Sequence, residues 1–325
     1  MKFKGIMLMV VMSMVMIFAA ACGNNSGNTE NSGNTNSGGE ASGEEVSGEV
    51  LMDGSSTVFP IMEAVAEEYA SVQPDVKVSV GVSGSGGGFE KFSAGETDMS
   101  NASRPIKEEE TAALEEAGID FTEFEIAKDG LSIVVNSEND WVDQLTIDDL
   151  KKIWLGEATM WSDVNPEWPE EKIELFSPGT DSGTYDYFNE VVLEDEQMVK
   201  EATLSEDDNV LVNGVTGSKN GMAFFGYAYY LENKDSLNVI PIVNGDGEAV
   251  EPNAETIQDG TYEPLSRPLY TYVKHSAVEE NPAVYDFTKY ALENAGEMAE
   301  AVGYVALPEE KYTEAMDKLN EIAGK

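Results

Sequence analysis

The chain has 325 residues and a formal net charge of −43 at pH 7, because it carries 62 Asp and Glu against 19 Lys and Arg. This balance argues against nucleic acid as a partner, since binding a phosphate backbone needs clustered Lys and Arg. With one Cys and one His, the chain lacks the ligands of a zinc cluster and a thiol–imidazole pair for nucleophilic catalysis. We therefore expect neither an enzyme nor a bound metal or cofactor.

The N-terminus has the pattern of a lipoprotein signal peptide. Two lysines precede an apolar stretch over 6–21, and small residues lead to Cys22, although Ala19 stands where Leu is usual. We expect residues 1–21 to be removed and Cys22 to be lipidated. No later stretch reaches the roughly 20 apolar residues of a spanning helix. The lipid alone would then hold an extracytoplasmic protein on the outer face of the cell membrane.

Residues 22–49 are almost entirely Gly, Asn, Ser, Thr and Glu. A segment of this composition cannot bury enough apolar surface to fold, so we expect a flexible tether. The rest of the chain is long enough for two domains or for one unit with two lobes.

After the tether, helical and strand-like patterns alternate. In chain order they predict a helix over 57–69, a strand over 76–82, a short helix from 89 to about 95, a helix over 107–117, strands over 121–126 and 131–135, a helix over 146–154, a strand over 173–176, a helix from 185, a buried segment over 222–230, a strand over 269–273, and helices near 282–298 and 308–322. Such alternation favours an α/β fold with parallel strands.

Three clusters of Gly, Ser and Thr each lead into a helical pattern: Gly54–Thr57, Ser83–Gly88 and Asp181–Thr184. A helix N-terminus offers unpaired N–H groups and the positive end of the macrodipole, so it attracts anions. Each cluster alone could be an ordinary turn or helix cap. Together they predict one small oxyanion held between converging helix ends. The acidic surface does not forbid this, because distant charges are screened over about 8–10 Å at physiological salt.

Arg104 is a further candidate ligand. It is one of few arginines in the chain and follows a strand-like run. A guanidinium makes bidentate contacts with tetrahedral oxyanions, although a surface salt bridge is the alternative in so acidic a chain. His275, the single histidine, has no partner at a motif-like spacing, so we do not expect it to act in catalysis.

In these segments the chain resembles the phosphate-binding subunit of bacterial phosphate ABC transporters, the PstS type. Five ordered blocks carry the resemblance: DGSSTVFPIMEAVAEEY, VSGSGGGFEKFSAGETDMSNASRPI, LTIDDLKKIWLGEATMWSDV, SPGTDSGTYDYF and PLSRPLYTYVK. The resemblance implies an α/β, two-lobed periplasmic-binding-protein fold (type II-like), with mixed sheets flanked by helices and a ligand cleft between the lobes.

By the same resemblance, lobe 1 would comprise 50–130 plus 268–325 and lobe 2 would comprise 131–267. The chain would cross between them near 127–130 and 265–268. The protein would be a monomer that captures inorganic phosphate by cleft closure and delivers it to the permease subunits of an ABC transporter.

Carried over by position, the phosphate ligands would be Ser56, Thr57, Ser85, Gly86, Ser182, Gly183 and Thr184. The family's best-known branch adds an Asp after the second loop and an Arg shortly before the third. Here those positions fall at Ser103 and Pro178. We infer that the charges have exchanged lobes, with Arg104 coming from lobe 1 and Asp181 from lobe 2.

A carboxylate at Asp181 would distinguish phosphate from sulfate. Phosphate near neutral pH keeps at least one proton, which a carboxylate can accept in a hydrogen bond, whereas sulfate keeps none. A buried acceptor left without a donor costs about 1–3 kcal/mol, and more when it is charged. The alternative role for Asp181 is a helix N-cap, and the two roles can coexist.

Three other functions remain open at this point. A receptor for another oxyanion, such as sulfate, molybdate or a phosphonate, would use the same loops. A phosphatase or phosphotransferase would need a metal cluster or a base, which the composition does not supply. A surface adhesion module would leave the three donor loops unexplained.

Overall fold

The computed structural model describes residues 46–180 and 182–325. The predicted signal peptide, the lipidation site Cys22, most of the tether and the predicted ligand Asp181 lie outside the described residues. Within the described ranges, none of the helices combines the length and the apolar composition that crossing a bilayer requires.

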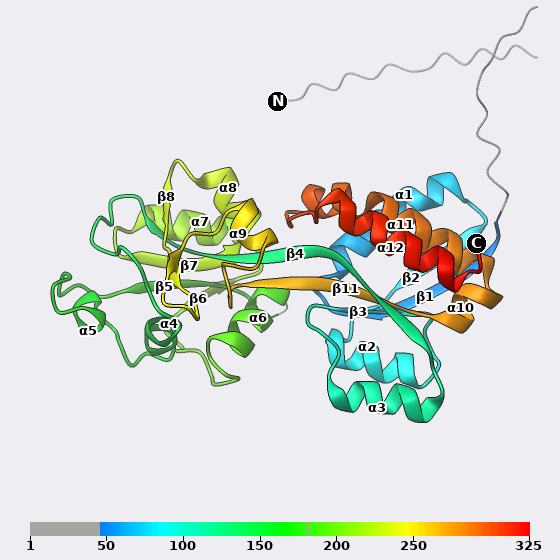
Figure 1. The fold of residues 1–325 in the computed structure, drawn as a ribbon. Helices are drawn as coiled ribbons and strands as arrows, with labels where there is room; N and C mark the ends of the chain where they lie inside the picture. Colours follow the sequence, from blue (N-terminus) through cyan, green and yellow to red (C-terminus); the bar gives the residue numbers. More distant parts are fainter. Residues whose placement is uncertain (1–45, 181) are drawn as a thin grey trace, which may run out of the picture. The chain divides into compact units, whose positions relative to one another are not determined.

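The helices follow the sequence patterns with shifted boundaries (Figure 1). They are α1 (Phe59–Val72), α2 (Gly84–Ser93), α3 (Glu108–Ala117), α4 (Ile147–Trp154), α5 (Trp161–Val164), α6 (Gly183–Val191), α7 (Asp208–Gly217), α8 (Tyr227–Asn233), α9 (Ala254–Gln258), α10 (His275–Glu280), α11 (Pro282–Ala301) and α12 (Glu309–Ile322).

The strands are β1 (Gly48–Gly54), β2 (Val76–Val80), β3 (Met99–Ala102), β4 (Phe121–Asn136), β5 (Glu174–Pro178), β6 (Thr203–Ser205), β7 (Gly221–Gly226), β8 (Leu237–Val239), β9 (Ile242–Val243), β10 (Ala249–Val250) and β11 (Ser266–Lys274). The main sheet has the order β2-β1-β3-β11-β4-β7-β5-β6, with β8 paired to β4. Strand β1 is parallel to β2 and β3, and β5 is parallel to β6 and β7. The sheet is mixed, because β4 and β11 run antiparallel to their neighbours.

The two largest hydrophobic cores cover different parts of this sheet. The first core consists of buried residues between Val50 and Ala127 and between Leu269 and Leu319. The second core consists of buried residues between Leu131 and Leu265, together with Val305. Strands β4 and β11 contribute to the first core and extend to the second (Figure 1).

Three predicted elements were wrong in their extent. The helix expected to start at Phe89 begins at Gly84, inside the second glycine cluster. The strands expected over 121–126 and 131–135 form one continuous strand, β4. The charged residues between the two expected strands are part of the pairing between β4 and β11, since Lys128 and Asp129 lie opposite Pro268 and Arg267. The expectation of parallel strands is likewise wrong for β4 and β11.

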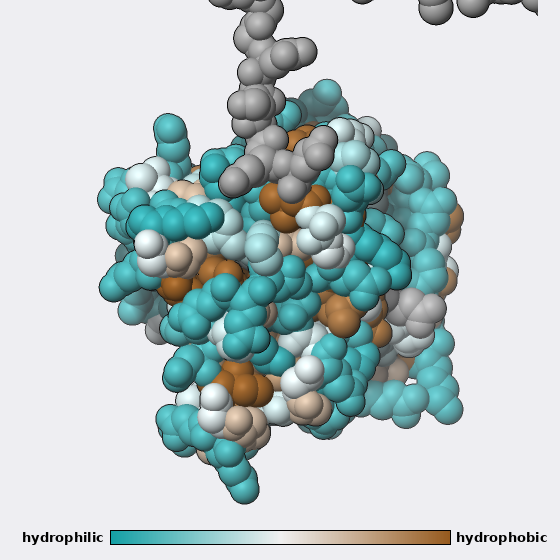
Figure 2. All heavy atoms as spheres, turned by 90° about the vertical axis from the view of Figure 1, so that its right-hand side faces the viewer, coloured by the Kyte–Doolittle hydropathy of each residue, from teal (hydrophilic) through white to brown (hydrophobic). Residues whose placement is uncertain are grey.

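The hydropathy of the surface agrees with the acidic composition of the chain. In Figure 2 the visible face is mainly hydrophilic, and its hydrophobic areas are small and separate. Large apolar side chains that are at least a third exposed include Leu51, Val72 and Val82. Isolated exposed apolar residues of this kind are normal for a folded protein.

Candidate anion-binding site

A cavity of about 170 Å³ lies where the three glycine-containing loops meet. Its lining residues are Ser55, Ser56, Thr57, Gly84, Ser85, Gly86, Ser103, Arg104, Gly183, Asp186, Glu190 and Arg267. Six of the predicted ligand residues are among them: Ser56, Thr57, Ser85, Gly86, Arg104 and Gly183. The structure therefore brings together residues from distant parts of the chain.

Two further predicted ligands, Ser182 and Thr184, are absent from the lining of this cavity. They have a local role, because Ser182 is the N-cap of α6 and its Oγ accepts a hydrogen bond from the amide of Thr184 at 3.2 Å. Ser182 therefore caps the start of α6.

The first loop connects β1 to α1 and is held against β3. Gly54 has a φ of +147°, and a Cβ atom there would lie 2.0 Å from the carbonyl oxygen of Asn101. No other residue type fits this approach. The Ser55 amide donates to the same carbonyl at 2.9 Å. The side chain of Ser55 accepts from the Thr57 amide at 3.2 Å, which sets the course of the loop along the cavity.

The second loop connects β2 to α2, and Asp53 of β1 anchors it. The Ser83 hydroxyl donates to one oxygen of Asp53, and the Lys91 ammonium donates to the other at 2.5 Å. Although Ser83 is the N-cap of α2, its side chain forms no capping hydrogen bond. The first-turn residues Gly84, Ser85 and Gly86 line the cavity. The positive end of this helix thus faces the space where an anion would bind.

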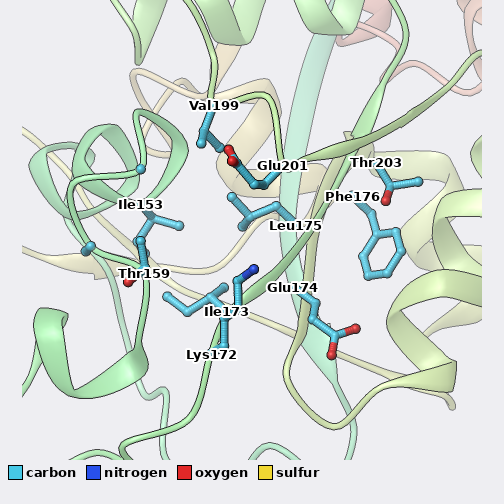
Figure 3. A pocket seen from close by; sticks show the side chains of 12 residues that line it. Ile153, Thr159, Lys172, Ile173, Glu174, Leu175, Phe176, Val199, Glu201 and Thr203 are labelled. Atoms are coloured by element: carbon cyan, nitrogen blue, oxygen red, sulfur yellow. The ribbon is translucent and has the colours of Figure 1, made fainter.

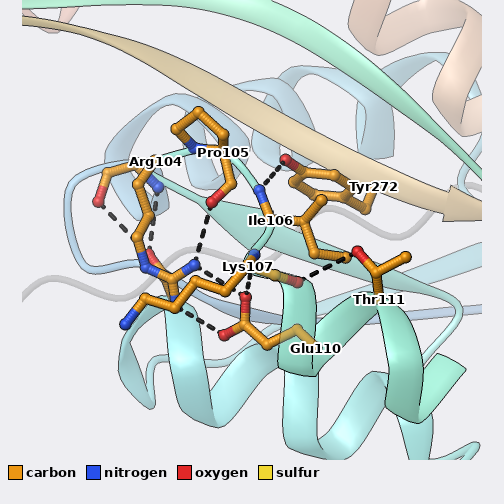
Figure 4. Close-up of polar contacts among 9 residues, drawn as sticks. Arg104, Pro105, Ile106, Lys107, Glu110, Thr111 and Tyr272 are labelled. Atoms are coloured by element: carbon orange, nitrogen blue, oxygen red, sulfur yellow. Dashed lines mark hydrogen bonds and ion pairs between the residues drawn. The ribbon is translucent and has the colours of Figure 1, made fainter.

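Arg104 enters the cavity from the segment that follows β3. The amide of Ser103 donates to the Ser85 hydroxyl at 3.2 Å, which fixes this segment beside the second loop. The two terminal nitrogens of Arg104 donate to the two oxygens of Glu110 at 2.8 and 2.6 Å, and Nη1 also donates to the carbonyl of Pro105 at 3.1 Å (Figure 4). The alternative of an ion pair for Arg104 is therefore realised, but at the edge of the cavity rather than away from it.

Glu110 is itself tightly held. It lies in the first turn of α3, and one of its oxygens accepts the Lys107 amide at 2.9 Å. Burial acts to raise the pKa of Glu110, but the hydrogen bonds from Arg104 and Lys107 outweigh it and keep this pKa below its ordinary value. The hydrogen bonds that Arg104 donates to Glu110 in turn raise the pKa of Arg104. Glu110 therefore keeps its charge and gives the Arg104 guanidinium one orientation.

Arg267 is the cavity-lining arginine that the sequence patterns missed. It was expected only in the second crossing segment, yet it lines the cavity and is 7% exposed. The chain contains two arginines, Arg104 and Arg267, and both lie between Ser and Pro. The repeated Ser-Arg-Pro sequence, together with the scarcity of arginine, was the signal that could have identified it.

Helix α6 supplies the opposite wall and brings negative charge. A Cβ atom on Gly183 would lie 2.3 Å from the Thr57 hydroxyl oxygen, so the start of α6 is in close contact with the first loop. Asp186 and Glu190 lie three and seven residues further along and also line the cavity. Residues at this spacing share one face of a helix. The site thus combines two guanidinium groups with two carboxylates.

A second cavity of about 450 Å³ lies beside α4, β5 and the segment that leads into β6 (Figure 3). Apolar side chains such as Ile153, Ile173 and Leu175 line it together with Lys172 and two glutamates. It contains none of the glycine-loop residues and neither arginine. Its larger size therefore does not make it the candidate oxyanion site.

Among the described residues, no group of three or more His, Cys, Asp or Glu side chains is arranged to hold a metal ion. The donors at the smaller cavity are hydroxyls, backbone amides and guanidinium groups. This is the donor set of a site for an oxyanion rather than for a cation.

Comparison with known proteins agrees with the fold. The model of the PBP superfamily domain matches residues 39–295. The phosphate-binding protein PstS of Staphylococcus saprophyticus is 49% identical over 278 residues, which cover 86% of each chain. PstS of Staphylococcus aureus is 43% identical over 309 residues, covering 95% of this chain and 90% of that one.

Solved structures are similar as well. A "possible phosphate binding protein" from Planctomyces limnophilus has 42% identity and a TM-score of 0.80, covering 86% of this chain and 100% of that one. An ABC-type phosphate transport receptor from Vibrio cholerae shares the fold, with 24% identity, a TM-score of 0.64, and coverage of 80% of this chain and 100% of that one. The chain is a member of the PBP superfamily and belongs to the PstS family of phosphate-binding proteins.

Proposed function

We propose that this protein captures inorganic phosphate in the cavity of about 170 Å³ and delivers it to the permease of an ABC transporter. One observation carries the proposal. The only two arginines of the chain and residues of three glycine-containing loops line the same small cavity. The names of the staphylococcal relatives and of the Vibrio receptor support phosphate as the ligand.

The proposed ligand groups are those predicted from the three loops, Ser56, Thr57, Ser85, Gly86, Ser182, Gly183 and Thr184, with Arg104 and Asp181. Hydroxyl and amide donors would pair with the phosphate oxygens, and Arg104 would add a charge-assisted contact. Within the described residues, Asp186 and Glu190 also bring carboxylates to the cavity. Carboxylates in an anion site favour a ligand that keeps a proton, which phosphate does and sulfate does not.

The proposed mechanism is closure of two lobes over the ion. Lobe 1 would comprise 50–130 plus 268–325, and lobe 2 would comprise 131–267. The separation of the two largest cores supports this division, and β4 and β11 would contain the crossing segments. Closure would remove the ion from water, which strengthens each polar contact in the site.

We further propose that the protein performs no catalysis and acts as a monomer outside the cytoplasmic membrane, held by a lipid on Cys22. The small-residue pattern before Cys22 and the polar composition of 22–49 support this placement. The lipid would be the sole attachment to the membrane, and the permease subunits would be the protein partners.

Calorimetry on the chain from residue 23 onward, freed of endogenous ligand, tests the ligand assignment. Phosphate and then sulfate are titrated from about pH 5 to about pH 8.5. Micromolar or tighter phosphate binding, with no heat from sulfate, is the expected result, because about five ligand atoms at roughly 1.5 kcal/mol each correspond to a Kd of a few μM. Equal binding of both ions would make the protein a general oxyanion receptor. Binding of neither would overturn the proposal.

A further inference from the structure

Arg267 uses only part of its hydrogen-bonding capacity within the protein. A guanidinium has five N–H donors in a fixed planar fork. Its Nε donates to Asp129 at 3.2 Å, and its Nη2 donates to the Thr57 hydroxyl at 2.7 Å and to the Gly183 carbonyl at 3.1 Å. Within residues 46–180 and 182–325, Nη1 has no hydrogen-bond acceptor. Because Arg267 lines the cavity, this amino group is available to a bound ion.

The contacts of Arg267 connect elements that belong to different hydrophobic cores. On β11 it lies in register with Asp129 on β4, so the ion pair joins the two strands that extend from the first core to the second. Thr57 precedes α1, whose buried side chains belong to the first core. Gly183 starts α6, whose buried side chains belong to the second core. One guanidinium therefore contacts both sides of the cavity.

The surroundings of Arg267 fix its orientation before any ion binds. Its guanidinium carbon lies 3.9 Å from the centre of the Tyr187 ring, and the Tyr187 hydroxyl donates to the carbonyl of Pro264, near the start of β11. Asp129 is 2% exposed and supplies the compensating charge. Burial raises the pKa of Asp129, while Arg267 and the Gly130 amide act in the opposite direction. The side chain thus lies in a dry, preorganised position, where a charge-assisted contact is strong.

We propose that Arg267 is a ligand-binding residue that couples phosphate to closure of the cavity: Nη1 donates to the ion while Nη2 holds the Thr57 and Gly183 loops together. This inference rests on the proposed function and adds a second guanidinium to the ligand set. Lysine cannot replace Arg267 in this role, because an ammonium lacks the planar fork that serves Asp129, both loops and the ion simultaneously.

Two variants test the proposal in the chain from residue 23 onward. Arg267→Lys keeps a cation beside Asp129. The double variant Arg267→Gln with Asp129→Asn removes both charges, because loss of Arg267 alone would leave a buried carboxylate unpaired and endanger folding. Lys128→Met is the control, since Lys128 is adjacent to Asp129 on β4, pairs with Glu125 and does not line the cavity.

Phosphate affinity is measured by calorimetry, and closure is measured as the distance between spin labels at the exposed positions 116 and 148. Both Arg267 variants should bind phosphate about 10- to 100-fold more weakly than the wild type. They should also show less shortening of the label distance at saturating phosphate, whereas Lys128→Met should match the wild type in both measurements. If both Arg267 variants bound phosphate within twofold of the wild type and closed to the same extent, the proposed role of Arg267 would be overturned, but the proposed function would not. A wild-type chain that binds no phosphate would overturn the proposed function as well.

Discussion

Arg104 and Glu110 form a bidentate ion pair at the edge of the cavity, with nitrogen–oxygen distances of 2.8 and 2.6 Å. Both side chains are mostly buried, at 19% and 13% exposure. A guanidinium held in this way loses little conformational freedom when an ion binds, so more of the contact energy becomes affinity. We therefore expect Glu110 to act as a positioning residue for Arg104, although it does not line the cavity.

Arg104→Ala should weaken phosphate binding about 10- to 100-fold, because a charge-assisted contact is lost from a partly dry site. Arg104→Lys should recover only part of the affinity, since an ammonium cannot contact Glu110 through a bidentate fork. Calorimetry with phosphate measures both. If Arg104→Ala bound phosphate within twofold of the wild type, Arg104 would not be a ligand.

Glu110→Gln should leave Arg104 less well oriented and weaken phosphate binding about 3- to 10-fold, a smaller loss than that of Arg104→Ala. Because the pKa of Glu110 is lowered in the folded state, its contribution to stability is present above its ordinary pKa, 4.5, and disappears as pH falls through its lower folded value. Thermal unfolding should therefore separate the wild type from Glu110→Gln at neutral pH, and the two curves should converge in acid. If the unfolding temperatures of the wild type and Glu110→Gln differed by the same amount from neutral pH to acid, this would contradict a stabilising role of the ion pair.

Gly183→Ala should reduce phosphate affinity about tenfold or more with little loss of folding stability. The new methyl group would lie 2.3 Å from the Thr57 hydroxyl oxygen and 3.0 Å from the Thr57 amide nitrogen, so the start of α6 must move away from the first loop. Gly217→Ala is the matched control, because nothing lies within 4 Å of a Cβ atom at that position. Calorimetry and thermal unfolding of both variants check the prediction, and equal phosphate affinity in the two would refute it.

Asp181→Asn should raise sulfate binding from a negligible level while weakening phosphate binding. The carboxylate can only accept a hydrogen bond, whereas the amide can also donate one to the fully deprotonated ion. Competition between phosphate and sulfate, measured by calorimetry near neutral pH, reports the change in selectivity. If sulfate stayed silent in the variant, the carboxylates on α6 would become the candidates for proton recognition.

Asp208 should make stability depend on pH. Burial and the neighbouring charge of Asp207 raise the pKa of Asp208 to about 6. The folded chain then holds this proton to higher pH than the unfolded chain does. Its contribution to the free energy of unfolding is therefore fully present below an ordinary Asp pKa and is lost as pH rises through about 6.

Asp208→Asn removes this titration, so the wild type should lose on the order of 2 kcal/mol relative to the variant between about pH 4.5 and about pH 7.5. Urea unfolding at the two pH values measures the difference. If the wild type and the variant differed in free energy of unfolding by the same amount at both pH values, the pKa of Asp208 would not be raised in the folded protein.

Sequence patterns predicted the helices whose ends are set by residues close together in the chain. A capping box formed by Thr146 and Asp149 begins α4. Gly118 ends α3 in the left-handed conformation. These contacts depend on neighbours in the chain, which sequence spacing shows directly.

The start of α2 could not be predicted in the same way, because glycine is a poor helix former. A Cβ atom on Gly88 would lie 2.6 Å from the Cα atom of Gly54, so the helix can lie against β1 only with glycine there. The close contact between α2 and β1 therefore requires glycine, although glycine has a low helix propensity. Similarly, the charged stretch in the middle of β4 has the composition of a loop, and only its pairing with β11, where Arg267 lies opposite Asp129, makes it part of the strand.

By itself, the sequence determined the membership of the chain in its family, and it predicted the three donor loops and Arg104 as a candidate ligand, because each follows from residue types at short spacing. Only the tertiary structure decided that Arg267 enters the site, that Glu110 orients Arg104, and that Asp186 and Glu190 face the same cavity. The physical reason is that these relationships arise where strands and helices meet. Thr57 and Arg267, 210 residues apart, become hydrogen-bond partners only after the sheet has formed.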